Sequence, residues 1–285
     1  MHEESRSVRL KSGIAPLGLA LLLALLTVAG AAVASHKKVR GMTAVNRSDG
    51  AATHLARSIA EGRSDTVIRA KFVTIPPGGE PVAISERNLS GFPRKGRSFA
   101  ILSTGCARLA DNPDKSFMTS CRNGGVKTKG ARDVVIWRIR LNVPKGANCL
   151  SFRFKFLSEE YPEWVGSPFN DALIAEVGNA PRWNAAGNRD PSIRAPRNFV
   201  KTRDGNLVSV DGTGVARVSP RAARGTTYDA ATGKLRASTR VKPGKKTLHI
   251  SIFDQGDRQY DSTAFIDRLL VRKAAKCRSG VVGSK

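Results

Sequence analysis

The sequence predicts an all-β fold, an antiparallel β-sandwich of the jelly-roll or lectin-like kind with one short peripheral helix near its N-terminal end. Long runs alternate apolar and polar residues, which is typical of strands with one buried and one wet face. Turns rich in Gly and Pro separate these runs, and a single segment has the spacing of an amphipathic helix. We therefore expect roughly ten strands in two packed sheets.

The first 34 residues have the form of a secretory signal peptide. Arg6, Arg9 and Lys11 give a positive start, residues 14–34 are apolar, and Ala32-Val33-Ala34 is a small-x-small cleavage site. The alternative is an uncleaved anchor, because about 20 apolar residues can cross a bilayer. No later stretch is apolar enough to span a membrane, so we expect a secreted, extracellular protein that is free or associated with the cell wall.

One domain is expected over residues 51–277, between a basic lead-in at 35–50 and a short tail at 278–285. The helix is predicted over residues 51–61, where apolar residues recur on one side and Gly62 ends the run.

A strand is predicted over residues 66–75, and alternating strands are predicted over residues 134–143, 150–156 and 247–254. Residues 264–271 are apolar on both sides, which indicates a central or covered strand. Asp267 interrupts that strand; we expect it on a wet face, the alternative being that it accepts hydrogen bonds from a facing loop. Tyr260 and Phe265 are expected to pack. Residues 179–196, rich in Asn, Pro and Arg, are expected to form a long surface loop.

An even number of cysteines in an exported chain indicates disulfides. Cys106, Cys121, Cys149 and Cys277 allow three pairings, of which we favour Cys106–Cys121 and Cys149–Cys277. A zinc site is disfavoured, because the chain has no CxxC motif and few His.

The formal net charge of +25 favours anionic partners such as cell-wall polymers, acidic polysaccharides or lipid head groups. The positive charge is spread along the chain, so specific recognition of nucleic acid is not expected. The alternative is that Arg and Lys only keep the surface solvated.

Two acidic windows interrupt this basic chain. Residues 159–176 hold five carboxylates and no Lys or Arg, and residues 254–267 hold four Asp and one Arg. Each window begins where an alternating strand ends, so the two loops can meet at one edge of the sandwich. Oxygen ligands suit Ca²⁺, which relieves repulsion between neighbouring carboxylates. The predicted calcium ligands are Glu159, Glu160, Asn170, Asp171, Asp254, Asp257 and Asp261.

Other interpretations use the same residues. The acids can pair with surplus Arg or cap turns, and no stretch matches an EF-hand. A glycosidase needs two carboxylates about 5–5.5 Å or about 6.5–9.5 Å apart, and adjacent Glu159 and Glu160 would point to opposite faces if their strand continued. Tyr161, Trp164 and Phe169 can stack on sugar rings or cover the sandwich edge. No nucleophile or nucleotide motif is present, so we do not expect an enzyme.

The segment FRFKFLSEEYPEWVGSPFNDAL resembles the central motif of the choice-of-anchor L domain family. SFAILSTGCARLA is similar to the family's strand ending in Ser-Thr-Gly, and FDQGDRQYDSTAFID is similar to its closing Asp-rich motif. The resemblance covers residues 51–273 and implies a β-sandwich and an exported bacterial surface or secreted protein, without an established enzymatic activity. Family members attach by varied C-terminal anchors; this chain ends at Lys285 with neither a sorting motif nor a hydrophobic helix, so we expect free secretion or retention by charge.

We therefore expect an extracellular binding or adhesion module, stabilised by calcium, that presents an acidic and aromatic loop surface to a glycan or another surface ligand. The first alternative is a binder of anionic cell-wall polymer, driven by net positive charge; the second is a secreted polysaccharide hydrolase. A charge-driven binder would lose affinity steeply with salt, whereas a calcium-shaped site would respond to a chelator.

Overall fold

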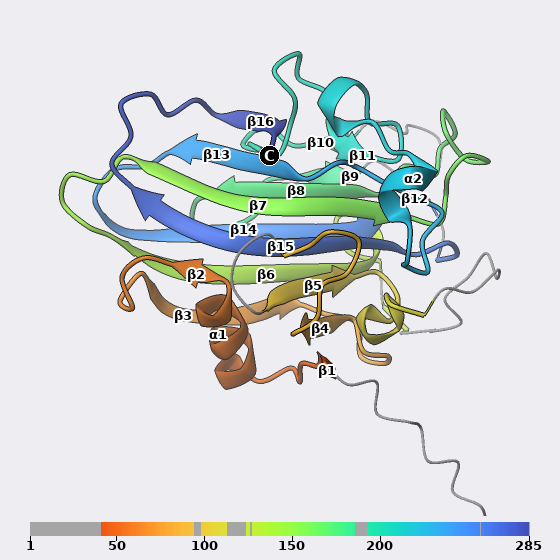
Figure 1. Cartoon of the computed structure of the whole chain (residues 1–285), viewed down its shortest axis with the longest axis horizontal. Helices are drawn as coiled ribbons and strands as arrows, with labels where there is room; N and C mark the ends of the chain where they lie inside the picture. The colour runs from red at the N-terminus through yellow and green to blue at the C-terminus, as the bar shows by residue number, and fades with distance from the viewer. Residues whose placement is uncertain are drawn as a thin grey trace, which may run out of the picture. The chain divides into compact units, whose positions relative to one another are not determined.

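Two sheets and the core between them make up the fold of this computed structural model, which describes residues 41–93, 98–112, 124–125, 127–185, 193–256 and 258–284. Within those residues the larger sheet has nine strands in the order β1-β4-β5-β15-β7-β13-β16, with β12 also on β7 and β2 on β15. The smaller sheet has five, in the order β11-β8-β14-β6-β3. All pairings are antiparallel except that of β2 with β15, so the predicted all-β sandwich is confirmed (Figure 1).

The larger sheet comprises β1 (Met42–Ala44), β2 (Ala60–Glu61), β4 (Val82–Ser85), β5 (Phe99–Ser103), β7 (Cys149–Ser158), β12 (Ala230–Ala231), β13 (Leu235–Arg240), β15 (Ser262–Arg272) and β16 (Gly280–Gly283). The smaller sheet comprises β3 (Val67–Thr74), β6 (Arg132–Val143), β8 (Ala172–Val177), β11 (Val208–Ser209) and β14 (Gly244–Asp254). A separate pair is formed by β9 (Asn184–Ala185) and β10 (Ile193–Arg194). The helices are α1 (Asp49–Ser58) and α2 (Pro220–Ala223), with single 3-10 turns at η1 (Ala107–Leu109) and η2 (Gly214–Ala216).

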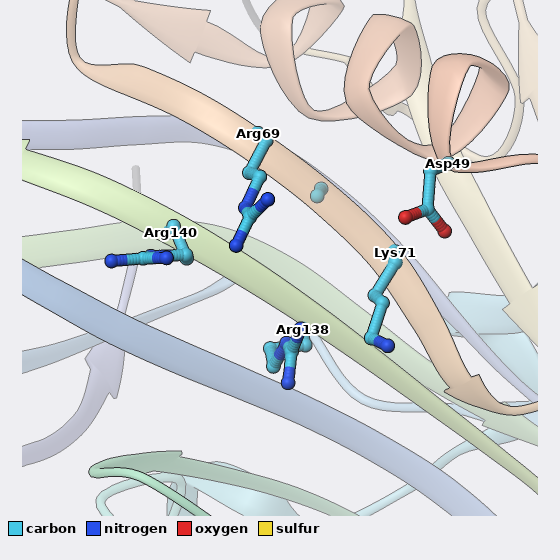
Figure 2. A pocket seen from close by; sticks show the side chains of 6 residues that line it. Asp49, Arg69, Lys71, Arg138 and Arg140 are labelled. Carbon is cyan, nitrogen blue, oxygen red and sulfur yellow. The ribbon is translucent and has the colours of Figure 1, made fainter.

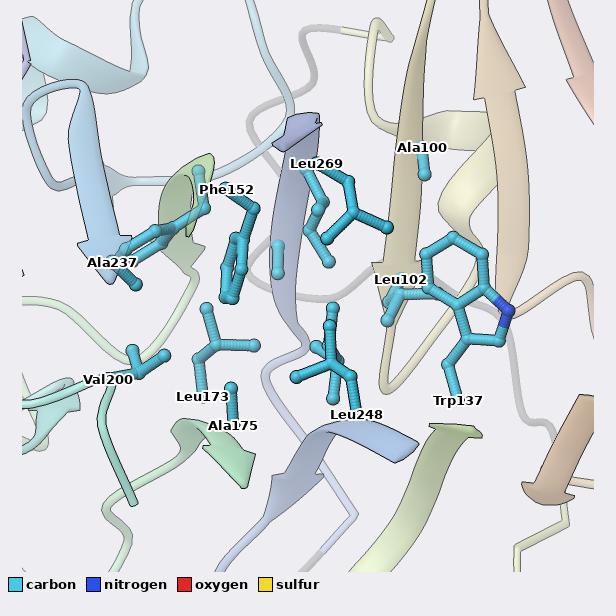
Figure 3. Packing of buried hydrophobic residues seen from close by; sticks show 14 of the residues in the cluster. Ala100, Leu102, Trp137, Phe152, Leu173, Ala175, Val200, Ala237, Leu248 and Leu269 are labelled. Atoms are coloured by element: carbon cyan, nitrogen blue, oxygen red, sulfur yellow. The ribbon is translucent and has the colours of Figure 1, made fainter. Parts of the chain in front are cut away.

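The main core lies between the two sheets and follows from the alternation in the sequence. Phe152 and Phe154 on β7 face Leu248 on β14 and Trp137 on β6 across one continuous cluster of buried side chains. Figure 3 shows Phe152 and Leu269 of the larger sheet opposite Leu173, Leu248 and Trp137 of the smaller one. The strands predicted from period-two patterns are therefore the ones that close the sandwich.

The outer face of the larger sheet differs from the expected wet face. A second apolar cluster covers β5, β7 and β15 there, formed in part by Phe92 and Tyr228 from segments distant in sequence. Phe265 packs into this cluster, as predicted, next to Phe92 and Phe99. Lys155 on β7 is also buried beneath it, and its ammonium donates to Ser90 O and Ser90 Oγ at 3.0 and 2.7 Å.

Helix α1 begins two residues earlier than predicted and ends three earlier, because residues 60–61 form β2, and it packs against β3. Ser48 Oγ accepts from Ala51 N at 3.1 Å, which caps the first turn. Its buried face, including Leu55, joins the main core. Thr53 Oγ1 accepts from Ala70 N at 2.8 Å, so the helix covers part of the edge of β3.

Several predicted irregular segments contain structure. The tail after Cys277 forms β16 on β13, and the lead-in contains β1 on β4. The predicted surface loop holds Trp183, which is fully buried and stacks on Phe253 at 4.3 Å. This polar loop covers part of β14 because its one aromatic side chain packs on an apolar surface of that strand.

The predicted Cys149–Cys277 disulfide is confirmed. Cys106 is also disulfide-bonded, while its predicted partner Cys121, like the leader, lies outside the described residues. In the described part of the chain, no helix has the length and apolarity that crossing a membrane requires.

Candidate functional site

The two acidic windows meet at one end of the sandwich, as the strand ends predicted. The connection after β7 crosses to β8 in the smaller sheet, and the connection after β14 crosses back to β15 in the larger one. Ser158 pairs with Ser262 and Phe253 pairs with Ala172, so both connections leave from neighbouring positions. Five predicted carboxylates gather there, and we call them the acidic junction: Glu159, Glu160, Asp171, Asp254 and Asp261.

Backbone hydrogen bonds hold the two connections together through these carboxylates. Glu159 N donates to Asp261 O at 3.1 Å, and Asp261 N donates to Glu159 Oε2 at 3.1 Å. Asp171 Oδ1 accepts from Gln255 N at 2.9 Å, and Glu160 Oε2 accepts from Asp171 N at 3.4 Å. Adjacent Glu159 and Glu160 both contribute because β7 ends at Ser158, so the alternation of a continuing strand does not apply to them.

All five carboxylates are buried. Asp261 is the most accessible at 7 % exposure, and Asp254 is only 1 % exposed. Both oxygens of Asp254 lack a hydrogen-bond partner of normal geometry among the described residues, although Thr104 and the Asp171 carboxyl lie close enough to affect its pKa. A buried carboxylate in this condition must be protonated or must bind a cation.

The electrostatics of the junction favour uptake of positive charge. Burial raises the pKa of Asp254 well above its ordinary value, and the nearby Asp171 and Asp261 carboxylates raise it further. Burial also raises the pKa of Asp261, followed by repulsion from Glu159 and Asp171. Tyr228 hydrogen-bonds with Thr263 beside the junction, and burial and then Glu159 raise the pKa of its hydroxyl.

The strand β5 supplies a third wall that the sequence analysis did not assign to the site. Thr104 Oγ1 accepts from Ser262 N at 2.9 Å, which fixes the end of β5 to β15. The Asp261 carboxylate lies over Gly105, where an added Cβ would be 1.6 Å from Asp261 Oδ2. Only glycine fits at that position. The Ser-Thr-Gly run was the signal that could have identified this wall.

Asp133, near the beginning of β6, is a further acid that the sequence analysis missed. It is 4 % exposed, its Oδ1 accepts from Gly125 N at 2.9 Å, and its charge contributes to the raised pKa of Asp261. Burial raises the pKa of Asp133 as well. The signal was faint, because a single Asp next to Arg132 reads as a solvated pair in the sequence.

The carboxylate oxygens of the junction suit a hard cation. Carboxylate oxygens are the ligands that Ca²⁺ prefers, and the Asp254 oxygens, which lack hydrogen-bond partners of normal geometry among the described residues, fit such an ion. Within the described residues, no three His, Cys, Asp or Glu side chains already stand in a metal-holding arrangement. Binding an ion would therefore require these side chains to move closer together. Asp257, a predicted ligand, lies outside the described residues.

The described side-chain contact of Asn170 lies outside the acidic junction. Its Oδ1 accepts from Asp211 N at 3.2 Å, and Asp211 Oδ1 accepts from Gly166 N at 2.6 Å. These bonds attach the β7–β8 loop to the segment after β11. Asn170 therefore has a structural role between two loops, and its role as a metal ligand stays a prediction.

Aromatic side chains border the junction on the solvent side. The ring centroids of Trp164 and Phe169 are 5.0 Å apart, and those of Trp164 and Tyr260 are 5.9 Å apart. We call these three half-buried residues the aromatic rim. Gly256 lies against Phe169, and an added Cβ there would be 2.5 Å from the ring. Tyr161, also predicted to bind ligand, packs on the main core instead.

Asp267 does not lie on a wet face, so that prediction was wrong. It is 4 % exposed, and burial raises its pKa to about 6. The pairing of β15 with β7 shifts register just after it, and Arg268 adopts a φ of 54°. The outer face is covered here, which explains the burial.

The family model of the choice-of-anchor L domain matches residues 86–269, a range that includes every residue of the acidic junction and the aromatic rim. No curated protein matches the chain. Among solved structures, the chain is similar to one described as TmCBM61 in complex with beta-1,4-galactotriose, with a TM-score of 0.31, 11 % identity, and coverage of 72 % of this chain and 88 % of that chain. Nothing about a ligand follows from likeness at this level.

Proposed function

Because the chain belongs to the choice-of-anchor L domain family, we propose that it is an exported binding or adhesion module whose acidic junction takes up Ca²⁺ and thereby fixes the aromatic rim for a glycan or another surface ligand. The family is associated with exported bacterial surface proteins, which agrees with the signal-like leader. The observation that carries the calcium part is the Asp254 carboxylate, which is buried among other carboxylates and lacks a hydrogen-bond partner of normal geometry among the described residues.

Local compensation of charge is the physical reason for calcium. Isolated buried carboxylates are costly, and proteins respond by protonating them or by binding a metal. After burial, the largest influences on the pKa of Asp254 and Asp261 include other carboxylates, which raise it. A divalent cation would remove this repulsion at neutral pH, where protons are scarce.

The junction is coupled to the aromatic rim by the chain itself. Glu160 and Asp171 stand at the two ends of the loop that carries Trp164 and Phe169. Trp164 N donates to Glu160 O at 3.0 Å, so the position of Glu160 affects the position of the Trp164 backbone that carries the indole. Filling the junction would therefore order both ends of this loop and present the half-buried rings as one surface, which suits stacking on sugar rings.

A hydrolase is disfavoured by the same burial. A glycosidase needs two carboxyl groups that reach opposite sides of a sugar ring. The candidate carboxylates are at most 7 % exposed, so a ring cannot enter between them. A bare ion can, which leaves binding as the better proposal.

Thermal unfolding of the chain lacking residues 1–34, with excess Ca²⁺ or with EDTA at fixed ionic strength, tests this proposal. At 100-fold excess over the Kd, calcium is expected to add about 2.7 kcal/mol, or about 5–11 °C in midpoint for a protein of this size. Asp171→Asn should remove most of the shift, while the exposed control Asp204→Asn should keep it. An unchanged midpoint would eliminate calcium from the proposed function.

The role of the rim needs its own measurement. Trp164→Ala should leave the calcium shift within about 1 kcal/mol of the original, because the indole is only half-buried. The same variant should lose binding to an array of immobilised bacterial oligosaccharides that the parent protein binds in Ca²⁺. Equal binding by both proteins would refute the glycan surface while leaving the metal site intact.

A further inference from the structure

A basic groove lies on the outer face of the smaller sheet. Figure 2 shows Arg69 and Lys71 on β3, Arg138 and Arg140 on the neighbouring β6, and Asp49 at the beginning of α1. Together with Ala70 they line a hollow of about 140 Å³. We call the four cations the basic groove.

Among the described residues, none of the four cations makes an ion pair or a side-chain hydrogen bond. Arg69 is exposed, and the other three are half-buried. Other basic residues of the same chain do find acids, as Arg268 does with Glu61 at 2.6 Å. The groove therefore keeps all its donors available to a ligand.

The register places these cations in a two-by-two array. Arg69 pairs with Arg140, and Lys71 pairs with Arg138. Neighbouring strands are about 4.8 Å apart, and alternate residues along a strand are about 6.7 Å apart. Like charges directly opposite on a sheet are destabilising, so this array costs stability unless an anion compensates it.

The strand on the other side of β6 places a buried, uncharged ring next to these cations. His249 on β14 pairs with Arg138 and is 2 % exposed. Burial, and secondly Arg138, lower the pKa of His249 to about 4, so its imidazole is neutral in neutral solution. The groove therefore presents guanidinium and ammonium groups beside a neutral ring, with Asp49 as the single acid that lines it.

We propose that the basic groove binds the phosphate groups of an anionic polymer outside the cell. Each cross-strand pair offers N–H donors that point in several directions, since Arg has five and Lys three. Phosphate oxygens point in several directions and accept from guanidinium groups in pairs, so one phosphate can join two strands. This site goes beyond the calcium-dependent function and lies on different strands.

Two double variants with the same change of charge test the proposal. Arg138→Gln with Arg140→Gln removes half of the groove, and Arg221→Gln with Arg224→Gln removes two exposed Arg near α2 as the control. Binding to poly(glycerol phosphate) is measured in EDTA, so the calcium proposal has no influence on the result. The groove variant should bind about tenfold or more weakly. The slope of its log affinity against log salt concentration should become less steep by about two. The control should stay within about twofold.

Equal losses in both variants would show that net charge alone attracts the polymer and would overturn the proposal. Polygalacturonate is the second probe, and equal affinity for it would overturn the preference for phosphate over carboxylate. Inorganic phosphate is the third, and binding as tight as that of the polymer would refute the polymeric ligand. If the first variant unfolds, Arg69→Gln with Lys71→Gln on β3 makes the same comparison, since Arg69 is exposed and Lys71 half-buried.

Discussion

Protons and calcium should compete for the acidic junction, and Asp254→Asn separates their effects. Because the pKa of Asp254 is raised, the folded protein keeps this proton up to a higher pH than the unfolded chain does. Stability from this group is therefore present at about pH 4 and is lost towards neutral pH. Without calcium, the variant should gain stability relative to the parent protein between these pH values, since Asn carries no charge at either.

Asp267→Asn is the matched control, because Asp267 is a buried acid outside the junction. Its pKa of about 6, against an ordinary 3.8, corresponds to about 3 kcal/mol of unfolding free energy lost between about pH 4 and pH 7. Screening by nearby solvent reduces this to roughly half. The Asn variant should recover that amount at pH 7, with or without calcium.

Calcium should reduce the stability advantage that Asp254→Asn has at pH 7, and should leave that of Asp267→Asn unchanged. At 100-fold excess over its Kd, the ion adds about 2.7 kcal/mol to the parent protein, and a variant that binds tenfold more weakly gains only about 1.4 kcal/mol. At about pH 4 protons occupy the junction, so calcium should add little to either protein.

Urea unfolding at about pH 4 and pH 7, in Ca²⁺ and in EDTA, gives all of these free energies. Differences between variants are required, because His249 has a pKa lowered to about 4 and therefore adds stability over the same pH range in which the acids lose it. If calcium stabilises Asp254→Asn as much as the parent protein at pH 7, Asp254 is not a ligand and the reasoning fails.

Two further predictions concern the frame around the junction. Gly105→Ala should cost about 1–3 kcal/mol or more and abolish the calcium response, because its Cβ would be 1.6 Å from Asp261 Oδ2. Gly233→Ala, which has open space around it, should do neither. Urea unfolding with and without Ca²⁺ checks both variants, and a normal calcium response in Gly105→Ala would contradict the packing. Replacing both Cys149 and Cys277 by Ser should lower the unfolding free energy by up to about 5 kcal/mol, since the disulfide closes a loop of 128 residues; unchanged urea unfolding would exclude that contribution.

Period-two patterns predicted the strands that face the core. They failed to predict burial where segments distant in sequence cover the outer face of a sheet. Phe152 and Phe154 lie where alternation places them. Lys155 is buried on the opposite face because Phe92, Tyr228 and their neighbours fold over it, and Asp267 is buried on that face beside Arg153. Those segments are short and irregular, so no periodic signal in the sequence marks them.

The site could be predicted in part for a similar reason. Carboxylates placed directly after two strands identified Glu159 and Asp254, because the strand ends determine where the loops meet. Asp133 and Gly105 come from strands whose partners were not known from the sequence, so nothing connected them to the junction. The contact of Asn170 with Asp211 joins two loops that are 41 residues apart, and no pattern in the sequence predicts it.

The excess of Arg and Lys does not solve the problem of the buried acids, and this separates the two proposed sites. Interactions between exposed charges are screened beyond about 8–10 Å at physiological salt, so a net charge of +25 spread over the surface cannot compensate Asp254. Compensation must be local, by a proton or a bound cation. The same screening acts fully on the basic groove, where the exposed Arg69 faces solvent. Raising salt should therefore release a phosphate polymer from the groove while calcium remains in the junction, and the two sites can be switched off independently in one protein.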